Sequence, residues 1–184
     1  MIGIGIDIGG TNVKLAAFTA EGRQLAESRF KTESGRGRAD FLRRLTGAAR
    51  ELKGSLAGKA VSVGIGMAGD IDPDAGAARF SPNLCGWRDL PVAGPLEKAL
   101  KLPCFIENDA NMAAWGAYAS ELKGAGGNAI AVTLGTGVGG GIILDGKLYH
   151  GAHGSAGEIG HFVIRPGGAR CGCGQRGCLE AYCG

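Results

Sequence analysis

A histidine and three cysteines near the end of the chain have the spacing of a metal site. His161 is followed, after nine intervening residues, by Cys171, Cys173 and Cys178 in a glycine-rich segment. This Cys3His set has the ligand number and softness that suit structural zinc. The alternative is a group of buried thiols without a metal, but a glycine-rich loop offers no hydrophobic core for them to fill. The spacing therefore predicts a structural Zn2+ site.

A second group of residues has the chemistry of a phosphate-binding turn. Residues 7–14 read DIGGTNVK, which predicts a strand, a glycine turn and a returning strand. Backbone N–H groups in such a turn can face an anion because no Cβ intervenes. Thr11 adds a hydroxyl and Lys14 adds a positive charge. The alternative is an ordinary hairpin turn without a ligand.

Residues 134–141, LGTGVGGG, form a second glycine turn. Gly135, Gly137 and Gly140 have the spacing of a dinucleotide-binding pattern, but that pattern must be followed by a helix, and GIILDGKLY follows instead. The P-loop pattern also fails, because Leu148 stands where a magnesium-binding Ser or Thr is required. We expect the two glycine hairpins to lie in two separate lobes of the protein. Together they can hold one triphosphate from both sides of a cleft.

The segment ENDAN, residues 107–111, offers a carboxylate as a candidate catalytic base. It lies at the junction of an expected short strand and a helix. A carboxylate at a strand end that faces an interlobe cleft can accept the proton of an attacking substrate hydroxyl. The alternative is a structural role, in which Asn108 caps the helix and Asp109 complements the helix dipole.

The composition argues against several classes of protein. The 20 basic and 17 acidic side chains give a net charge of +3 without a block of like charge, so neither nucleic acid nor an anionic membrane is an expected partner. The start of the chain lacks a basic leader and a cleavage pattern, and there is no apolar run of about 18 residues, so we expect a cytoplasmic protein. Six cysteines in a cytoplasmic protein argue against a disulfide framework.

The elements that position these groups follow from the hydrophobic pattern. Alternation predicts strands, and helical spacing predicts helices that end near glycines. The expected elements are strands at 2–8, 13–19 and 24–30, a helix at 39–54, a strand at 60–67, a helix at 91–101 opening on Pro91, a strand at 103–107, a helix at 109–122, and strands at 129–134, 141–145 and 147–150.

This order of elements is that of the ribonuclease-H-like, actin-type ATPase fold, which is an α/β fold. We expect a complete first lobe at residues 1–120, with the first phosphate turn and the base. Residues 121–184 would begin a second, truncated lobe that holds the second phosphate turn and the zinc cluster. Its strands would leave an apolar face uncovered, which favours association.

The sequence resembles the ROK-family bacterial glucokinases and their relatives. The resemblance rests on DIGGT, ENDAN and LGTGVGGG, on GEIGH at residues 157–161, and on the cysteine cluster with the CLE that ends it. It covers nearly the whole chain, and GEIGH with the cluster is the most specific mark. It implies ATP-dependent phosphorylation of a hexose hydroxyl, with glucose the expected substrate, and with ATP, Mg2+ and structural Zn2+ as cofactors.

The resemblance also implies a role for individual residues. Asp109 is the implied base, and His161 is implied to bind zinc through one ring nitrogen and a sugar hydroxyl through the other. The implied sugar ligands are Asn108, Asp109, Glu158, His161 and Glu180, with Gly69 and Asn83 as weaker candidates. The implied ATP site comprises Asp7, Gly9, Gly10, Thr11, Asn12, Lys14, Gly135, Thr136, Gly137, Gly139 and Gly140, with Asp7 near magnesium. The implied metal ligands are His161, Cys171, Cys173 and Cys178.

The chain departs from the family in two respects. Family members carry an adenine pocket in a longer second lobe, whereas this sequence ends at Gly184, where many members have a serine. We therefore expect little or no kinase activity from these 184 residues alone, and a homodimer of the complete protein.

Two other functions are consistent with the same motifs. One is a sugar-sensing repressor of the same family, which would carry an N-terminal helix-turn-helix, whereas the first strand here begins at residue 2. The other is a non-catalytic sugar-binding fragment. Other actin-type ATPases share the glycine hairpins but give no reason for the zinc cluster. The hexose itself stays open among glucose, N-acetylglucosamine, mannose, fructose and allose.

Overall fold

The computed structural model describes residues 1–122, 126–135 and 137–184. The chain forms two compact units, Met1–Asp109 and Ala110–Gly184. The boundary between them lies at the start of helix α3 (Asp109–Glu121), and the expected boundary at residue 120 lies near the other end of that helix. The roles expected for the two lobes stay predictions.

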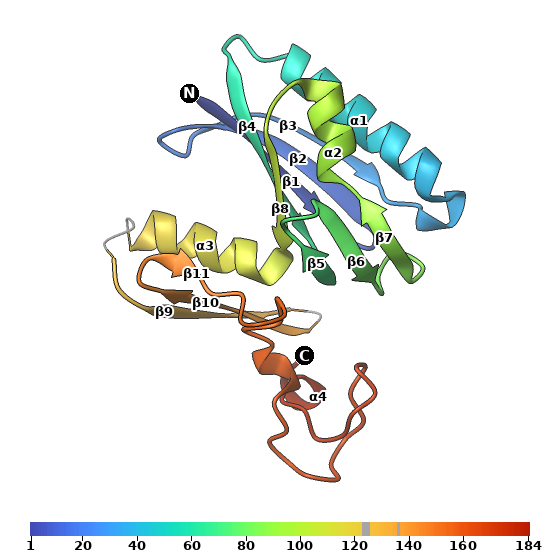
Figure 1. Ribbon diagram of the computed structural model, residues 1–184, viewed down its shortest axis with the longest axis vertical. Coiled ribbons are helices and arrows are strands. Elements are labelled where there is room, and N and C mark those ends of the chain that lie inside the picture. The colour runs from blue at the N-terminus through green and yellow to red at the C-terminus, as the bar shows by residue number, and fades with distance from the viewer. Residues whose placement is uncertain (123–125, 136) are drawn as a thin grey trace. The chain divides into compact units, whose positions relative to one another are not determined.

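The first unit is built on a five-stranded sheet in the order β3-β2-β1-β4-β8 (Figure 1). Its strands are β1 (Ile2–Ile8), β2 (Asn12–Thr19), β3 (Gln24–Lys31), β4 (Ala60–Met67) and β8 (Cys104–Asn108). The first three form the expected antiparallel meander, and β1, β4 and β8 run parallel. This arrangement confirms the ribonuclease-H-like fold that the element order predicts.

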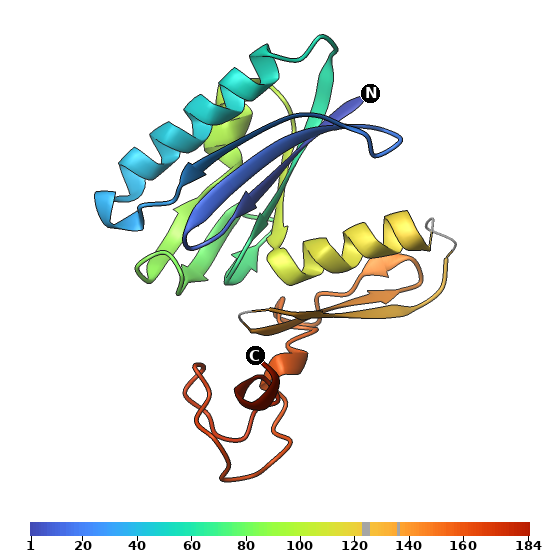
Figure 2. The ribbon, with the colours of Figure 1, turned by 180° about the vertical axis from the view of Figure 1, so that it is seen from behind.

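Helices α1 (Arg38–Gly54) and α2 (Ala93–Leu100) cover one face of this sheet, and Figure 2 shows the strands from the other side. In α1 the buried side chains are Phe41, Leu45, Ala49 and Leu52, which recur at helical spacing. They pack into one core with the buried residues of the central strands.

Pro91 does not open helix α2, contrary to the expectation. It is the last residue of strand β7 (Trp87–Pro91), where it pairs with Ala77. The backbone N–H groups of Val92 and Ala93 both donate to the carbonyl of Gly76, so the chain is held in the strand up to this point. The helix begins only at Ala93.

A small three-stranded sheet, which the hydrophobic pattern did not predict, lies between β4 and α2 in the sequence. It consists of β5 (Asp70–Asp72), β6 (Ala77–Ser81) and β7. Arg79 of β6 binds both carboxylates of β5, with Nη1 at 3.0 Å from Asp70 Oδ1 and Nη2 at 2.9 Å from Asp72 Oδ2. Backbone pairing of β5 with β6 and of β6 with β7 holds these strands, and their burial does not alternate strictly, so the hydrophobic pattern does not reveal them.

The second unit packs α3 on a three-stranded antiparallel sheet. Its strands are β9 (Ala129–Leu134), β10 (Val138–Leu144) and β11 (Lys147–Leu148), followed by the short helices η2 (Ile159–His161) and α4 (Glu180–Cys183). A side chain at Gly141 would collide with Ala114 of α3, and one at Gly139 would come within 2.8 Å of Ala110. The glycines of β10 therefore let the helix approach the strand. Among the described residues, no helix is long and apolar enough to span a membrane.

The other face of β9 is apolar and exposed. Ile130, Val132 and Leu134 are 68%, 50% and 71% exposed and alternate along the strand. This agrees with the expectation of an uncovered apolar face. Association through it stays a prediction.

Thr32 ties the end of β3 to the first glycine turn. Its side chain is fully buried, and Oγ1 donates to the carbonyl of Gly9 at 2.6 Å. Its backbone N–H donates to the carbonyl of Thr11, and its own carbonyl accepts from Arg44 Nη2 at 2.6 Å. One residue thus fixes the turn at two carbonyls.

Thr32→Val should lower the free energy of unfolding by about 1–3 kcal/mol, because valine fills the same space but leaves the carbonyl of Gly9 without its donor. Urea denaturation would measure the change. Thr32→Ser keeps the hydroxyl and is the control, and a valine variant as stable as the serine variant would contradict this assignment.

Candidate functional site

The carboxyl ends of three parallel strands lie level at one edge of the first sheet. Ile8 of β1 pairs with Met67 of β4, and Met67 pairs with Asn108 of β8. The segments that leave these strands therefore emerge at the same edge, where ligands of α/β sheets commonly bind. They are the turn at Gly9, the Ala68–Gly69 segment and Asp109, the first residue of α3. The side chain of Asp109 is exposed.

The first glycine turn is closed by a hydrogen bond from Gly9 N–H to the carbonyl of Asn12, at 3.0 Å. A Cβ at Gly10 would lie 3.1 Å from Asn83, so this proposed sugar ligand packs directly against the turn. Gly10, Thr11 and Asn12 are exposed. The structure therefore leaves the outer side of the turn accessible to a ligand.

Asp7 and Lys14 face each other on either side of this turn. They are cross-strand partners in β1 and β2, and Lys14 Nζ lies 3.6 Å from Asp7 Oδ2. Both side chains are more than half exposed, so the pair contributes little to stability. It does place one positive and one negative charge beside the glycines.

Gly69 acts through its backbone. Its φ is +126°, and a side chain there would collide with the carbonyl of Phe80, so only glycine fits. Its carbonyl accepts a hydrogen bond from Asn108 Nδ2 at 3.2 Å, which orients the amide of the residue before Asp109. Glu107, largely buried, accepts from the backbone N–H of Asn108 at 2.8 Å.

The second glycine turn joins β9 to β10. The N–H of Gly135 donates to the carbonyl of Gly137, and Thr136 lies outside the described residues. The N–H of Val138, the first residue of β10, donates to Glu180 Oε2 at 3.0 Å. Gly139 and Gly140 lie in the strand itself, and packing accounts for their lack of a side chain. Of the described glycines here, Gly135 and Gly137 form the turn.

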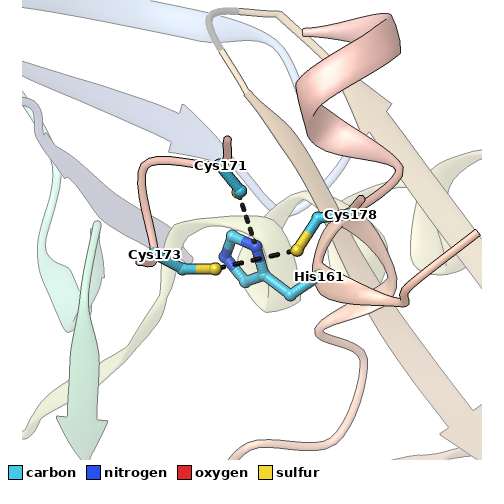
Figure 3. A group of neighbouring side chains, drawn as sticks. All are labelled: His161, Cys171, Cys173 and Cys178. Atoms are coloured by element: carbon cyan, nitrogen blue, oxygen red, sulfur yellow. Dashed lines mark hydrogen bonds between the residues drawn. The ribbon is translucent and has the colours of Figure 1, made fainter. Parts of the chain in front are cut away.

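The expected metal ligands lie together in the second unit, and Figure 3 shows the four side chains. Cys173 Sγ lies 3.8 Å from Cys178 Sγ, and Cys171 Sγ lies 3.6 Å from His161 Nδ1. All four ligand atoms lie within 4.8 Å of one another. A tetrahedral zinc ion with its usual bond lengths separates two sulfurs by about 3.8 Å, and a sulfur from a nitrogen by about 3.6 Å. The residues therefore fit zinc.

The two ring nitrogens of His161 face different groups. Nδ1 faces Cys171, whereas Nε2 lies 3.8 Å from Glu158 Oε2. A metal-binding histidine usually presents its second nitrogen to an acceptor, which fixes the ring. The nitrogen that would face a sugar hydroxyl is thus the one next to Glu158.

Backbone hydrogen bonds hold the ligand-bearing loop together. Val163 and Cys178 form a β-bridge, and the N–H of Leu179 donates to the carbonyl of Phe162 at 2.9 Å. Phe162 and Ile164 are 64% and 56% exposed, so they add little apolar burial to the loop. A metal would therefore supply the cross-link that a core supplies elsewhere.

The cysteines differ in their acidity without a metal. Burial raises the pKa of the Cys178 thiol to about 11, whereas a hydrogen bond from the backbone N–H of Gln175 lowers the pKa of Cys173. Only thiolates bind zinc, so metal binding must displace the proton from Cys178.

The family model that describes the ROK family matches residues 3–184. The glucokinase of Halalkalibacterium halodurans is 41% identical over 184 residues, which is 96% of this chain and 54% of that protein. The chain thus spans about half the length of this curated relative.

Solved structures with the same fold include a kinase and a regulator. The ROK family glucokinase from Streptomyces griseus, in complex with glucose and AMPPNP, aligns with a TM-score of 0.82 and 37% identity over 99% of this chain and 57% of that one. A ROK family transcriptional regulator, a homologue of the E. coli MLC protein, aligns with a TM-score of 0.83 and 27% identity over 99% of this chain and 46% of that one. The motifs, the fold and the family match together show that the chain belongs to the ROK family.

Proposed function

We propose that this chain carries the residues that bind the hexose and the ATP phosphates in an ATP-dependent sugar kinase, with glucose as the substrate. One observation carries the proposal: the register of β1, β4 and β8 brings the glycine turn and Asp109 to the same edge of one sheet. A phosphate turn and an exposed carboxylate at one strand edge suit the transfer of a phosphoryl group to a hydroxyl.

In the proposed reaction a hexose hydroxyl oxygen attacks the γ-phosphorus of ATP. The bond from phosphorus to the bridging oxygen of ADP breaks, ADP leaves, and the carboxylate of Asp109 accepts the hydroxyl proton. The ATP phosphates would bind the backbone N–H groups of the two glycine turns, with Asp7 near Mg2+ and Lys14 close by. The proposed ATP residues are Gly9, Gly10, Thr11, Asn12, Gly135, Thr136 and Gly137, together with Gly139 and Gly140 of strand β10.

The proposed sugar ligands are Asn108, Asp109, Glu158, His161 and Glu180. Asn83 would contribute beside the first turn, and Gly69 would contribute by orienting Asn108. Zinc held by His161, Cys171, Cys173 and Cys178 would fix the imidazole and take no part in the chemistry.

A sugar-binding regulator is the second candidate, because a ROK regulator shares this fold. The two functions separate in an assay of the protein made from its complete reading frame. ADP release with glucose, measured against N-acetylglucosamine, mannose, fructose and allose, would support the kinase. Glucose binding without ADP release would support the regulator or a non-catalytic sugar-binding protein.

Asp109→Asn should lower kcat by on the order of 10²-fold or more, with glucose affinity largely retained, because asparagine keeps the shape but cannot accept the proton. Coupled measurement of ADP release gives kcat, and calorimetry gives the glucose affinity. Asp74→Asn, at an exposed turn, is the control. Near-normal turnover in the Asp109 variant would remove this residue from the mechanism.

The chain should hold about one zinc ion tightly, as a Cys3His site predicts, and chelation should lower both stability and glucose affinity because His161 belongs to both sites. Elemental analysis, thermal unfolding and calorimetry before and after chelation would test this. Cys173→Ser should lose the metal, whereas Cys85→Ser, outside the cluster, should keep it. Metal-free protein from zinc-replete medium would refute the site.

A further inference from the structure

Glu180 contacts the second glycine turn directly. Its Oε2 accepts a hydrogen bond from the backbone N–H of Val138 at 3.0 Å. A Cβ at Gly137 would lie 2.5 Å from the same oxygen, so the carboxylate packs closely on the turn backbone. The role proposed for Glu180 as a sugar ligand does not account for this contact.

The backbone around Glu180 is fixed by the segments that carry the metal ligands. Glu180 follows Cys178 by two residues, and the intervening Leu179 donates its N–H to the carbonyl of Phe162, next to His161. The N–H of Gly184 donates to the carbonyl of Glu180 and closes the last turn of α4. The side chain therefore projects from a point that both ligand segments define.

A further contact joins Cys171 Sγ and Glu180 Oε1 at 3.6 Å. It requires a thiol that donates, and a zinc-bound thiolate cannot donate. The link through Cys178 and the backbone of Phe162 does not depend on it.

The same strand residue is contacted from the other ligand segment. A side chain at Gly160, which precedes His161, would collide with the carbonyl of Val138. The same segment also approaches β10 two positions further along, because a Cβ at Gly157 would lie 2.8 Å from the carbonyl of Gly140. Val138 is thus contacted at its carbonyl by the segment before His161 and at its N–H by Glu180, two residues after Cys178.

We propose that Glu180 is a positioning residue for the second glycine turn. The four metal ligands, His161, Cys171, Cys173 and Cys178, would then set the geometry of the proposed phosphate-binding backbone as well as that of the proposed sugar ligands. The consequence for nucleotide binding rests on the proposed function. The contacts that connect the metal-ligand segments with Val138 do not depend on that function.

Amide hydrogen exchange at Val138 in the zinc-loaded chain tests the link. Glu180→Ala removes the acceptor and should speed exchange at Val138 about tenfold or more. Glu180→Gln keeps an oxygen that can accept from Val138 and should restore slow exchange. Exchange at Gly141, further along β10, should stay unchanged and reports whether the variant is folded.

Two further arms keep the test decisive. Glu180→Asp keeps the charge but is one methylene shorter, so it should speed exchange at Val138 even if the alanine variant fails to fold. Removal of the metal from wild-type protein by a chelator should also speed exchange at Val138. Equal exchange at Val138 in wild type, Gln and Asp variants would overturn the proposal.

Calorimetric binding of Mg-ATP separates this proposal from the proposed function. If wild type binds Mg-ATP, the Asp variant should bind it more weakly and the Gln variant nearly as well. If wild type shows the Glu180-dependent protection but binds no Mg-ATP, the phosphate role fails and the positioning stands. If Mg-ATP binds equally to all variants with unchanged exchange, the positioning fails and the kinase proposal stands.

Discussion

Close backbone approach to strand β10 is the constraint on which the second unit depends. On one face, the missing side chains of Gly139 and Gly141 admit helix α3. On the other face, Gly140 meets Gly157, and Gly160 meets the carbonyl of Val138. Because interiors pack densely, even one added methyl group at such a contact must displace backbone. The strand that leaves the glycine turn therefore cannot move independently of the helix or of the segment that carries His161.

Close packing against β10 is a second reason, besides phosphate binding, for the high glycine content. Glycines at the two turns suggest a backbone that approaches phosphate, and the first turn keeps that interpretation because its outer residues are exposed. In β10 the glycines instead serve helix and loop packing. The loop that carries the proposed metal ligands has exposed apolar residues, so apolar burial adds little to its stability. The segments that carry the proposed metal ligands thus fix strand β10 through a few close contacts, such as those of Glu180 and Gly160 with Val138.

Much of the fold follows from local pattern. Strands β4 and β9 match their expected bounds, because alternation and turn glycines define them. The sheet β5-β6-β7 was missed because its strands have three, five and five residues and their burial does not alternate strictly. The start of α2 was misplaced for a related reason: proline favours a first helical turn, yet here the pairing of Pro91 with Ala77 keeps it in a strand.

The candidate site was predictable to a different extent in each unit. Strand ends predict that Asp109 lies level with the first turn, since parallel strands share a carboxyl edge. Cysteine spacing predicts which four side chains meet, and the structure adds that Nδ1 of His161 is the nitrogen on the cysteine side. The bond from Val138 to Glu180 joins residues 42 apart in sequence, and no local signal identifies it. Such contacts arise only when the loop is closed.

The proposed zinc ion organises this site and takes no part in the chemistry. X-ray absorption at the zinc edge, measured with and without glucose, tests this role. We expect three sulfur neighbours at about 2.3 Å and one nitrogen at about 2.0 Å in both samples, because glucose would meet only the other nitrogen of His161. A shell without three sulfurs, or an oxygen neighbour that enters when glucose binds, would contradict it.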